Sequence, residues 1–180
     1  MSQDRPFLAA ELTKLGVDLD PETLNRLLEF LNILQRANES TNLTAIRDYR
    51  EGLIKHLYDS LVILRLPEFK QAATILDVGS GGGIPALPLA IVCPQRSSCS
   101  LDATRKKVEF QTAAALELGL ANFTAYWGRA ETFGVDPRQR QAYDLVLARA
   151  VAATTVLVEF TLPFVKPGGY AMFYKGQDYR

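Results

Sequence analysis

The stretch Thr74-Ile75-Leu76-Asp77-Val78-Gly79-Ser80-Gly81-Gly82-Gly83 decides which fold this chain of 180 residues can adopt. Residues 74–78 form a short, mostly apolar segment typical of a buried strand, and a glycine-rich turn follows at once. Residues 84–92 are apolar and carry prolines early, where a helix tolerates them because its first N–H groups have no partner within the helix. The pattern predicts a strand, a tight turn and a helix, whose backbone can approach a nucleotide-like ligand closely.

The glycine spacing argues against a dinucleotide as that ligand. The dinucleotide fingerprint is G-x-G-x-x-G, but here the glycines are Gly79, Gly81 and Gly83, and Ile84 stands where the third is required. Asp77 would repel a pyrophosphate, whereas its carboxylate suits the ammonium and sulfonium of S-adenosylmethionine. The arrangement resembles motif I of the class I methyltransferases, so we expect these five residues to shape the methionine end of that cofactor. The alternative is a tight turn that binds nothing.

A second acid follows the next predicted strand. Residues 97–101 form that strand, and Asp102 comes about twenty residues after the glycine turn, where nucleotide-binding folds place an acid on the ribose hydroxyls. The alternative is that Asp102 only caps the following helix, for which Thr104 is another candidate. Both roles are compatible with each other.

The N-terminal part of the chain is predicted to be helical. Asp20-Pro21-Glu22 is a good helix start, and a loop from Asn38 to Arg47 leads to another helix over residues 48–66. Asp48 and Glu51 have the spacing of a capping box at the start of that helix. Leucines follow the first of these starts at helical spacing: Leu24, Leu27, Leu28, Leu31 and Leu34.

The rest of the chain alternates strands and helices, with Gly119 placed to end one helix in a left-handed conformation. Such alternation predicts an α/β fold, a mostly parallel Rossmann-like sheet with helices on both faces. We expect one domain over residues 1–180, with a helical region (1–66) before the cofactor-binding core (72–176). The strands are expected near 74–78, 97–101, 122–127, 142–148 and 169–175, and the helices near 85–93, 104–119 and 152–161.

Ligands of such sheets bind beyond the carboxyl ends of the strands. Besides Asp102, that rule selects Ala103 and Thr104, and then Ala130 and Glu131 after the third strand. Glu131 would accept from an adenine amino group, or else be a solvated charge or a helix cap. Arg149 ends the fourth strand, where a guanidinium holds a phosphate or carboxylate bidentately. The alternative role for Arg149 is a structural ion pair with Asp144 or Glu131.

Composition limits the remaining possibilities. Hydrophobic residues make up 48% of the chain, enough for a sizeable core, and twenty basic residues balance twenty acidic ones. Net charge therefore gives no sign of nucleic-acid binding, and any such surface must be a local patch. Because no leader or long apolar run is present, we expect a cytoplasmic protein. Cys93 and Cys99 are predicted to be idle thiols, and no metal site is expected.

Six segments together resemble the RsmG (GidB) family of bacterial methyltransferases. They are residues 42–48 (NLTAIRD), 56–60 (HLYDS), 76–85, 128–131, 148–152 and 162–169. The resemblance implies transfer of a methyl group from S-adenosylmethionine to N7 of a single guanine in 16S ribosomal RNA, leaving S-adenosylhomocysteine. The RNA is expected within the small ribosomal subunit or its precursor, and the enzyme as a monomer. By resemblance the cofactor contacts are Gly79, Ile84, Asp102, Ala103, Thr104, Ala130, Glu131 and Arg149, and Arg149 is also our candidate catalytic residue.

Several further residues are candidates for contacts with RNA. His56 and Asp59 could meet on one helix face, either to fix the N-terminal region against the sheet or to help seat RNA. Trp127 and Tyr126 could stack on a base, although aromatic residues in a strand usually join the core. Six scattered cations are further candidates for phosphate contacts: Arg47, Arg50, Arg105, Lys106, Lys107 and Arg129.

One expected element is missing from the sequence. A class I methyltransferase sheet normally continues with a hairpin of two strands after the fifth, but the chain stops at Lys175–Arg180. Three other readings therefore stay open. They are a nicotinamide oxidoreductase, a non-catalytic fragment that binds cofactor or RNA, and a methyltransferase acting on a small molecule or protein.

Overall fold

A computed structural model describes residues 3–149 and 154–174, and within them five strands form one sheet. The strand order is β3-β2-β1-β4-β5 and every neighbouring pair is parallel. The predicted parallel α/β fold is therefore confirmed. The strands are β1 (Thr74–Val78), β2 (Ser97–Asp102), β3 (Phe123–Trp127), β4 (Tyr143–Arg149) and β5 (Val165–Tyr174).

The fifth strand begins earlier than residue 169, where it was expected. Tyr143 pairs with Val165 and Leu145 pairs with Tyr170, so the register shifts between these two pairs. Pro167-Gly168-Gly169 lies between these two pairs. Proline and glycine usually end a strand, but here they form an irregularity within β5, and the strand continues past them.

Helices connect the strands as predicted, with two short additions. Gly119 has a φ of +63° and follows the second connecting helix, as its position indicated. The additions are a single turn, α8, and a 3₁₀ turn, η3. The elements are α6 (Ala86–Val92), α7 (Arg105–Glu117), α8 (Ala130–Phe133), α9 (Thr154–Thr161) and η3 (Leu162–Phe164).

The N-terminal region is helical but more broken than expected. Asp20 caps α2 by accepting from the N–H groups of Glu22 and Thr23, and α2 runs to Thr41, which is four residues into the predicted loop. The single helix expected over residues 48–66 changes geometry three times. The elements are α1 (Asp4–Lys14), α2 (Pro21–Thr41), α3 (Tyr49–Gly52), the π-helical turn η1 (Leu53–Tyr58), α4 (Asp59–Leu61), the 3₁₀ turn η2 (Val62–Arg65) and α5 (Pro67–Gln71).

Only half of the predicted capping box forms at the start of α3. Asp48 accepts a hydrogen bond from the backbone N–H of Glu51 at 2.8 Å. The carboxylate of Glu51 instead binds Lys55, one turn further along, at 2.5 Å. An ion pair at this spacing competes with the reciprocal bond back to Asp48.

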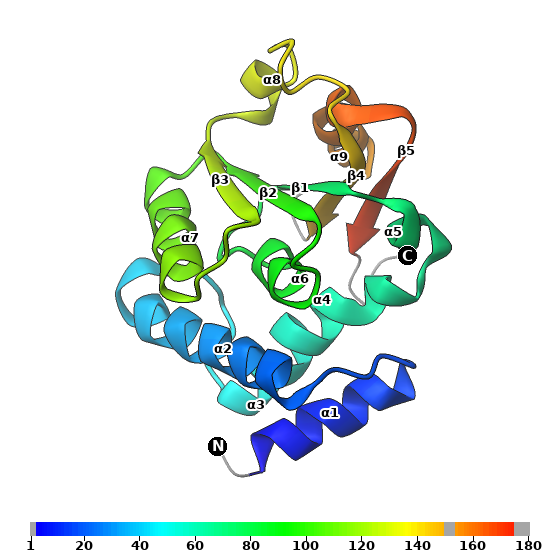
Figure 1. Cartoon of the computed structure of the whole chain (residues 1–180). Coiled ribbons are helices and arrows are strands. Elements are labelled where there is room, and N and C mark those ends of the chain that lie inside the picture. The colour runs from blue at the N-terminus through cyan, green and yellow to red at the C-terminus, as the bar shows by residue number, and fades with distance from the viewer. Residues whose placement is uncertain (1–2, 150–153, 175–180) are drawn as a thin grey trace.

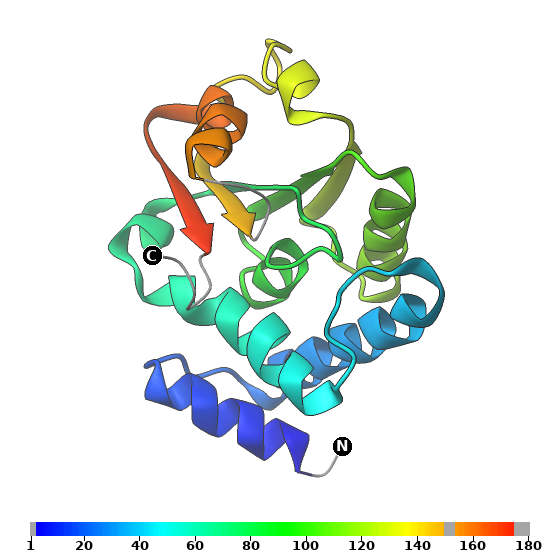
Figure 2. The same cartoon turned by 180° about the vertical axis from the view of Figure 1, so that it is seen from behind.

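Helices cover both faces of the sheet, and the N-terminal region adds a layer on one of them (Figures 1 and 2). Ile75 belongs to the larger core with α2 and α6, whereas Leu76 and Val78 belong to the smaller core on the other face, where Phe164 lies. This alternation along β1 follows from the period of two in a strand. α1 packs on the outside of α2 (Figure 1). The N-terminal helices therefore complete the core under the glycine turn.

Two sequence expectations fall outside the described residues. Residues 175–180, with the predicted end of the fifth strand, are one, and residues 150–152 of the segment 148–152, with the predicted start of the last helix, are the other. Among the helices that the structure describes, none is both long and apolar enough to cross a bilayer.

Candidate active site

The glycine turn after β1 adopts a conformation that requires glycine. Gly79, Gly81 and Gly83 have φ angles of +74°, +57° and +77°, in the left-handed region that other residues rarely adopt. A Cβ on Gly83 would also lie 2.5 Å from Cδ1 of Leu87, inside α6. The turn is tied to the next strand because Gly79 donates to the carbonyl of Leu101 at 2.8 Å.

A buried glutamine, which sequence reasoning missed, holds this turn in place. Gln111 of α7 is fully buried, and its Nε2 donates to the carbonyl of Gly81 at 2.8 Å and to Oγ of Ser80 at 2.9 Å. Its Oε1 accepts from Oγ of Ser100 at 2.5 Å. The sequence does carry a signal, because Gln111 is a polar residue between Val108 and Ala115 on the buried stripe of the helix.

Asp102 also binds the glycine turn. Its Oδ2 accepts from the N–H of Gly81 at 2.9 Å, and its Oδ1 accepts from the N–H of Thr104 at 2.8 Å. The N-cap of α7 is Thr104, whose side chain makes no capping bond, so the reading of Asp102 as the cap itself is wrong. A carboxylate offers about four acceptor sites, so Asp102 retains capacity for a ligand.

A cleft of about 410 Å³ opens at the carboxyl ends of the strands. It lies where the strand order reverses around β1, the usual ligand position in such sheets. Of the predicted residues, the structure gathers six at this cleft: Gly79, Asp102, Ala103, Ala130, Glu131 and Arg149. Gly81, Gly83, Ile84 and Thr104 do not line it. Lys107, Arg129 and Phe160 line it although they were not in the predicted cofactor set.

Asp77 lies outside the cleft and is fully buried in β1. Its neighbour Val78 lines the cleft, and Asp77 points to the opposite face of the sheet because side chains alternate along a strand. Neither of its carboxylate oxygens has a hydrogen-bond partner among the described residues. Burial raises the pKa of Asp77 well above its usual value, and the nearby backbone N–H of Ala86, followed by the Arg149 guanidinium, opposes that rise only in part.

Arg149 joins the end of β4 to the N-terminal region. Its Nη2 donates to the carbonyl of Lys55 at 2.5 Å and lies 3.9 Å from the carboxylate of Asp59. The predicted alternative partner Asp144 binds Lys166 at 2.8 Å instead. Nη1 of Arg149 is buried without a partner among the described residues, and other parts of the side chain line the cleft.

His56 has a structural environment and does not pair with Asp59. It is buried, and its Nε2 lies 3.0 Å from Oγ1 of Thr44 in the loop between α2 and α3. Burial, followed by the nearby Arg149, lowers the pKa of His56 to about 4, so the ring is neutral at physiological pH. Asn38 holds the same loop by accepting from the N–H groups of Leu43 and Thr44. His56 therefore braces this loop against η1.

The aromatic pair at the end of β3 is divided between two environments. Tyr126 packs against the smaller core, as is usual in a strand. Trp127 is 57% exposed, and its Nε1 donates to the carbonyl of Ala103, which lines the cleft, at 3.1 Å.

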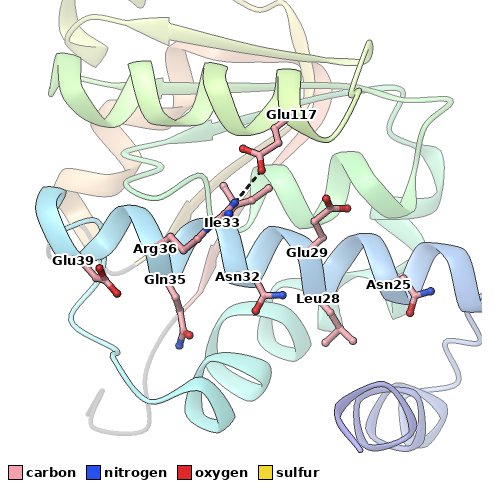
Figure 3. A pocket seen from close by; sticks show the side chains of 9 residues that line it. All are labelled: Asn25, Leu28, Glu29, Asn32, Ile33, Gln35, Arg36, Glu39 and Glu117. Carbon is pink, nitrogen blue, oxygen red and sulfur yellow. Dashed lines mark hydrogen bonds and ion pairs between the residues drawn. The ribbon is translucent and has the colours of Figure 1, made fainter. Parts of the chain in front are cut away.

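A larger hollow of about 730 Å³ lies on α2 and α7, away from the strand ends (Figure 3). Its nine lining residues include three acids and one cation, and Arg36 points to Glu117, which it binds at 2.9 Å (Figure 3). Its acids, Glu29, Glu39 and Glu117, outnumber its single cation, so this hollow is unsuited to a polyanion.

Cys93 and Cys99 are buried and form no disulfide, in agreement with the prediction of idle thiols. Within the described ranges, no group of three or more His, Cys, Asp or Glu side chains could hold a metal ion.

The order of the strands and the glycine turn define a methyltransferase-like α/β fold, which solved structures share. A putative O-methyltransferase from Klebsiella pneumoniae superposes with a TM-score of 0.58 at 18% identity, over 92% of this chain and 70% of that one. A putative S-adenosyl-L-methionine-dependent methyltransferase from Methanococcus maripaludis gives 0.55 at 17% identity, over 81% and 62%. At such identities the similarity establishes the fold alone.

Sequence comparison establishes the family. The family model described as GidB, rRNA small subunit methyltransferase G, matches residues 23–180. "Ribosomal RNA small subunit methyltransferase G" of Alkaliphilus metalliredigens is 42% identical over 163 residues, which are 91% of this chain and 68% of that protein. The protein of the same name from Deinococcus radiodurans is 42% identical over 172 residues, 96% of this chain and 68% of its own length. The chain belongs to the rRNA small subunit methyltransferase G family, as the resemblance indicated.

Proposed function

We propose that this chain transfers a methyl group from S-adenosylmethionine to N7 of a single guanine in 16S ribosomal RNA. The observation that carries the proposal is the cleft beside β1, where Gly79, Asp102 and Glu131 converge in a member of an rRNA methyltransferase family. The substrate is the small ribosomal subunit or its precursor, and the enzyme acts in the cytoplasm as a monomer.

The residues of the cleft suit the proposed cofactor. Asp102 has acceptor sites left for the ribose hydroxyls, and Ala130 and Glu131 border the adenine. The glycine turn, with Ile84, shapes the methionine end. Asp77 does not line the cleft, and its buried carboxylate would act on the cofactor ammonium only through the field of its charge, which that ammonium would favour by lowering the raised pKa of Asp77. When bound, the cofactor supplies an electrophilic methyl group on sulfonium.

The target atom explains why no general base is needed. Guanine N7 presents a lone pair and carries no proton. The protein therefore has to hold the nucleophile in line with the methyl group and keep both partners in place. Arg149, whose side chain lines the cleft, positions the cofactor or the guanosine. The carboxylates of Glu131 and Asp102, in a cleft that also holds Lys107, Arg129 and Arg149, favour the positive charge that methylated guanine acquires.

The test is methyl transfer from radiolabelled S-adenosylmethionine to unmodified small ribosomal subunits, beside naked 16S RNA. The Alkaliphilus relative is the matched comparison enzyme. We expect label at N7 of one guanine with both proteins, located by chemical cleavage of the RNA at N7-methylguanine. Label at another atom, or no label from this chain while the relative is active, would contradict the proposal.

Two other functions predict different outcomes in the same assay. A non-catalytic fragment would bind S-adenosylhomocysteine in calorimetry but transfer no methyl group. A methyltransferase acting on a small molecule or protein would label an extract from which RNA has been removed. A nicotinamide oxidoreductase is excluded because the chain belongs to a methyltransferase family.

A further inference from the structure

The only tryptophan of the chain is exposed at the end of a strand. Trp127 is the last residue of β3, yet 57% of its surface is accessible. A single exposed apolar side chain is common on protein surfaces and indicates nothing by itself. Trp127 is of interest because of its place: the next residue, Gly128, and its hydrogen-bond partner, Ala103, both line the cleft.

The indole ring is held in one orientation before any ligand arrives. Its Nε1 donates to the carbonyl of Ala103 at 3.1 Å, and Ala103 lines the cleft. Fixing the ring reduces the conformational entropy lost on binding, so a flat ligand gains more from stacking on it.

One cation contacts this ring, and others line the adjoining cleft. The guanidinium carbon of Arg105 lies 5.5 Å from the ring centroid, and its Nε is held by Glu109 at 2.9 Å. Lys107 and Arg129 line the same cleft. The acids of this region are Glu109, which is paired with Arg105, the exposed Glu131 and the buried Asp102. The cations Arg105, Lys107, Arg129 and Arg149 therefore outnumber them.

We propose that Trp127 is a stacking platform for an unpaired base of the RNA substrate, next to the nucleotide that is methylated. Lys107 and Arg129 meet the phosphates of that strand, and Arg105 braces the ring. Aromatic and guanidinium planes are how proteins bind unstacked bases of single-stranded RNA. The inference rests on the proposed function, because it assigns part of the cleft to the RNA rather than to the cofactor.

The acidic hollow on α2 and α7 makes a useful contrast (Figure 3). It is the larger depression, but its three acids and single cation would repel phosphates. Local charge therefore favours the Trp127 side of the molecule for RNA, although the chain as a whole is neutral.

The first test compares Trp127→Ala, Trp127→Phe and the wild type in methyl transfer to unmodified small subunits. Loss of one stacked base raises KM for the subunit about tenfold. We expect that increase in Trp127→Ala, partial recovery in Trp127→Phe, and no change in kcat or in the affinity for S-adenosylhomocysteine. The matched control is Tyr170→Ala, which removes another exposed aromatic residue, on β5, and leaves KM unchanged.

Two outcomes of that comparison overturn the proposal. A wild-type KM in Trp127→Ala shows that no base stacks there. A loss of affinity for S-adenosylhomocysteine as large as the rise in KM assigns the ring to the adenine of the cofactor instead.

The second test does not depend on catalysis. Because Trp127 is the only tryptophan, the tryptophan fluorescence of the protein reports on this ring alone. Titration with a single-stranded RNA oligonucleotide of mixed sequence should quench it, less so at high salt. If the wild type transfers no methyl group, the proposed function fails. The titration still shows, without any catalysis, whether RNA contacts Trp127. Absence of quenching while the RNA binds, as measured by anisotropy of a labelled oligonucleotide, would refute the platform.

Discussion

Arg149 donates a hydrogen bond to the carbonyl oxygen of Lys55, 94 residues earlier in the chain. Lys55 lies in the π-helical turn η1, a geometry often found at functional sites. Through this bond the N-terminal region reaches the carboxyl end of β4, where Arg149 also lines the cleft. Binding at the cleft and packing of the N-terminal helices are therefore coupled through one side chain.

Replacing Arg149 by alanine should reduce methyl transfer at least tenfold and also lower stability. The change removes a side chain that lines the cleft and a charged hydrogen bond, which contributes about 1.5–3 kcal/mol. The measurements are transfer to small subunits and urea unfolding. Arg138→Ala is the matched control, because Arg138 is 86% exposed and pairs only with nearby Asp136. Wild-type transfer in Arg149→Ala would remove this residue from the site.

Replacing Gln111 by leucine should loosen the glycine turn. The carbonyl of Gly81 and the hydroxyls of Ser80 and Ser100 would lose their partner, at a cost of about 1–3 kcal/mol for each buried group left unsatisfied. We expect weaker binding of S-adenosylhomocysteine in calorimetry and a lower unfolding midpoint. Gln71→Leu is the control on an exposed glutamine. Equal cofactor affinity in the two variants would show that the turn holds its shape without Gln111.

Replacing Asp77 by asparagine should change how stability depends on pH. A raised pKa in the folded state means that the folded protein holds its proton more tightly than the unfolded chain does. The contribution of Asp77 to the free energy of unfolding is therefore present below its unfolded pKa of about 3.8 and lost as the pH rises through the raised value. Asparagine removes this loss, so the variant should gain stability relative to the wild type between pH 5 and pH 8.

The measurement for Asp77 is urea unfolding of both proteins across that range without cofactor. Calorimetry should in addition show weaker cofactor binding by the variant, because the neutral amide cannot attract an ammonium. A difference in unfolding free energy that is constant with pH would refute the buried-acid account, and unchanged cofactor affinity would remove Asp77 from the cofactor site.

His56 should remain neutral from pH 8 down to about pH 5. Its folded pKa of about 4 lies below the unfolded value near 6.5, so the stability it contributes is present above pH 6.5 and lost as the pH falls to about 4. Since His56 is the only histidine, its ring C–H signals in NMR can be assigned directly. A midpoint near 6.5 in that titration would show that the ring is solvated rather than packed against Thr44.

The main strands and connecting helices were predictable because each has a local signal. Apolar runs, Gly119 and the Asp20-Pro21 start mark their own elements, and the structure confirms them. The π-helical turn was not predictable, since residues 53–58 have ordinary helical spacing. One of its carbonyl groups, that of Lys55, binds Arg149, a contact that local sequence does not specify. The start of β5 was missed because pairing with Tyr143 overrides the Pro-Gly-Gly signal.

For the candidate site, the rule that ligands bind at the carboxyl ends of parallel strands correctly placed six of the predicted residues at one cleft. The rule works because parallel strands have their carboxyl ends on one edge of the sheet. The same rule did not bring Asp77 to this cleft, since a one-residue step along a strand moves a side chain to the opposite face, and its contact with the cofactor stays a prediction. It also missed Gln111, whose partners Gly81 and Ser100 lie in two other elements.

The sequence by itself determined the parallel α/β fold, the glycine turn and the family, since these depend on local patterns of apolar residues, glycines and motif spacing. Only the tertiary structure decided that Gln111 supports the turn, that Arg149 binds the N-terminal region and that Trp127 stays exposed. The physical reason is that burial and hydrogen-bond partners are set by segments far apart in the chain, which no local pattern specifies.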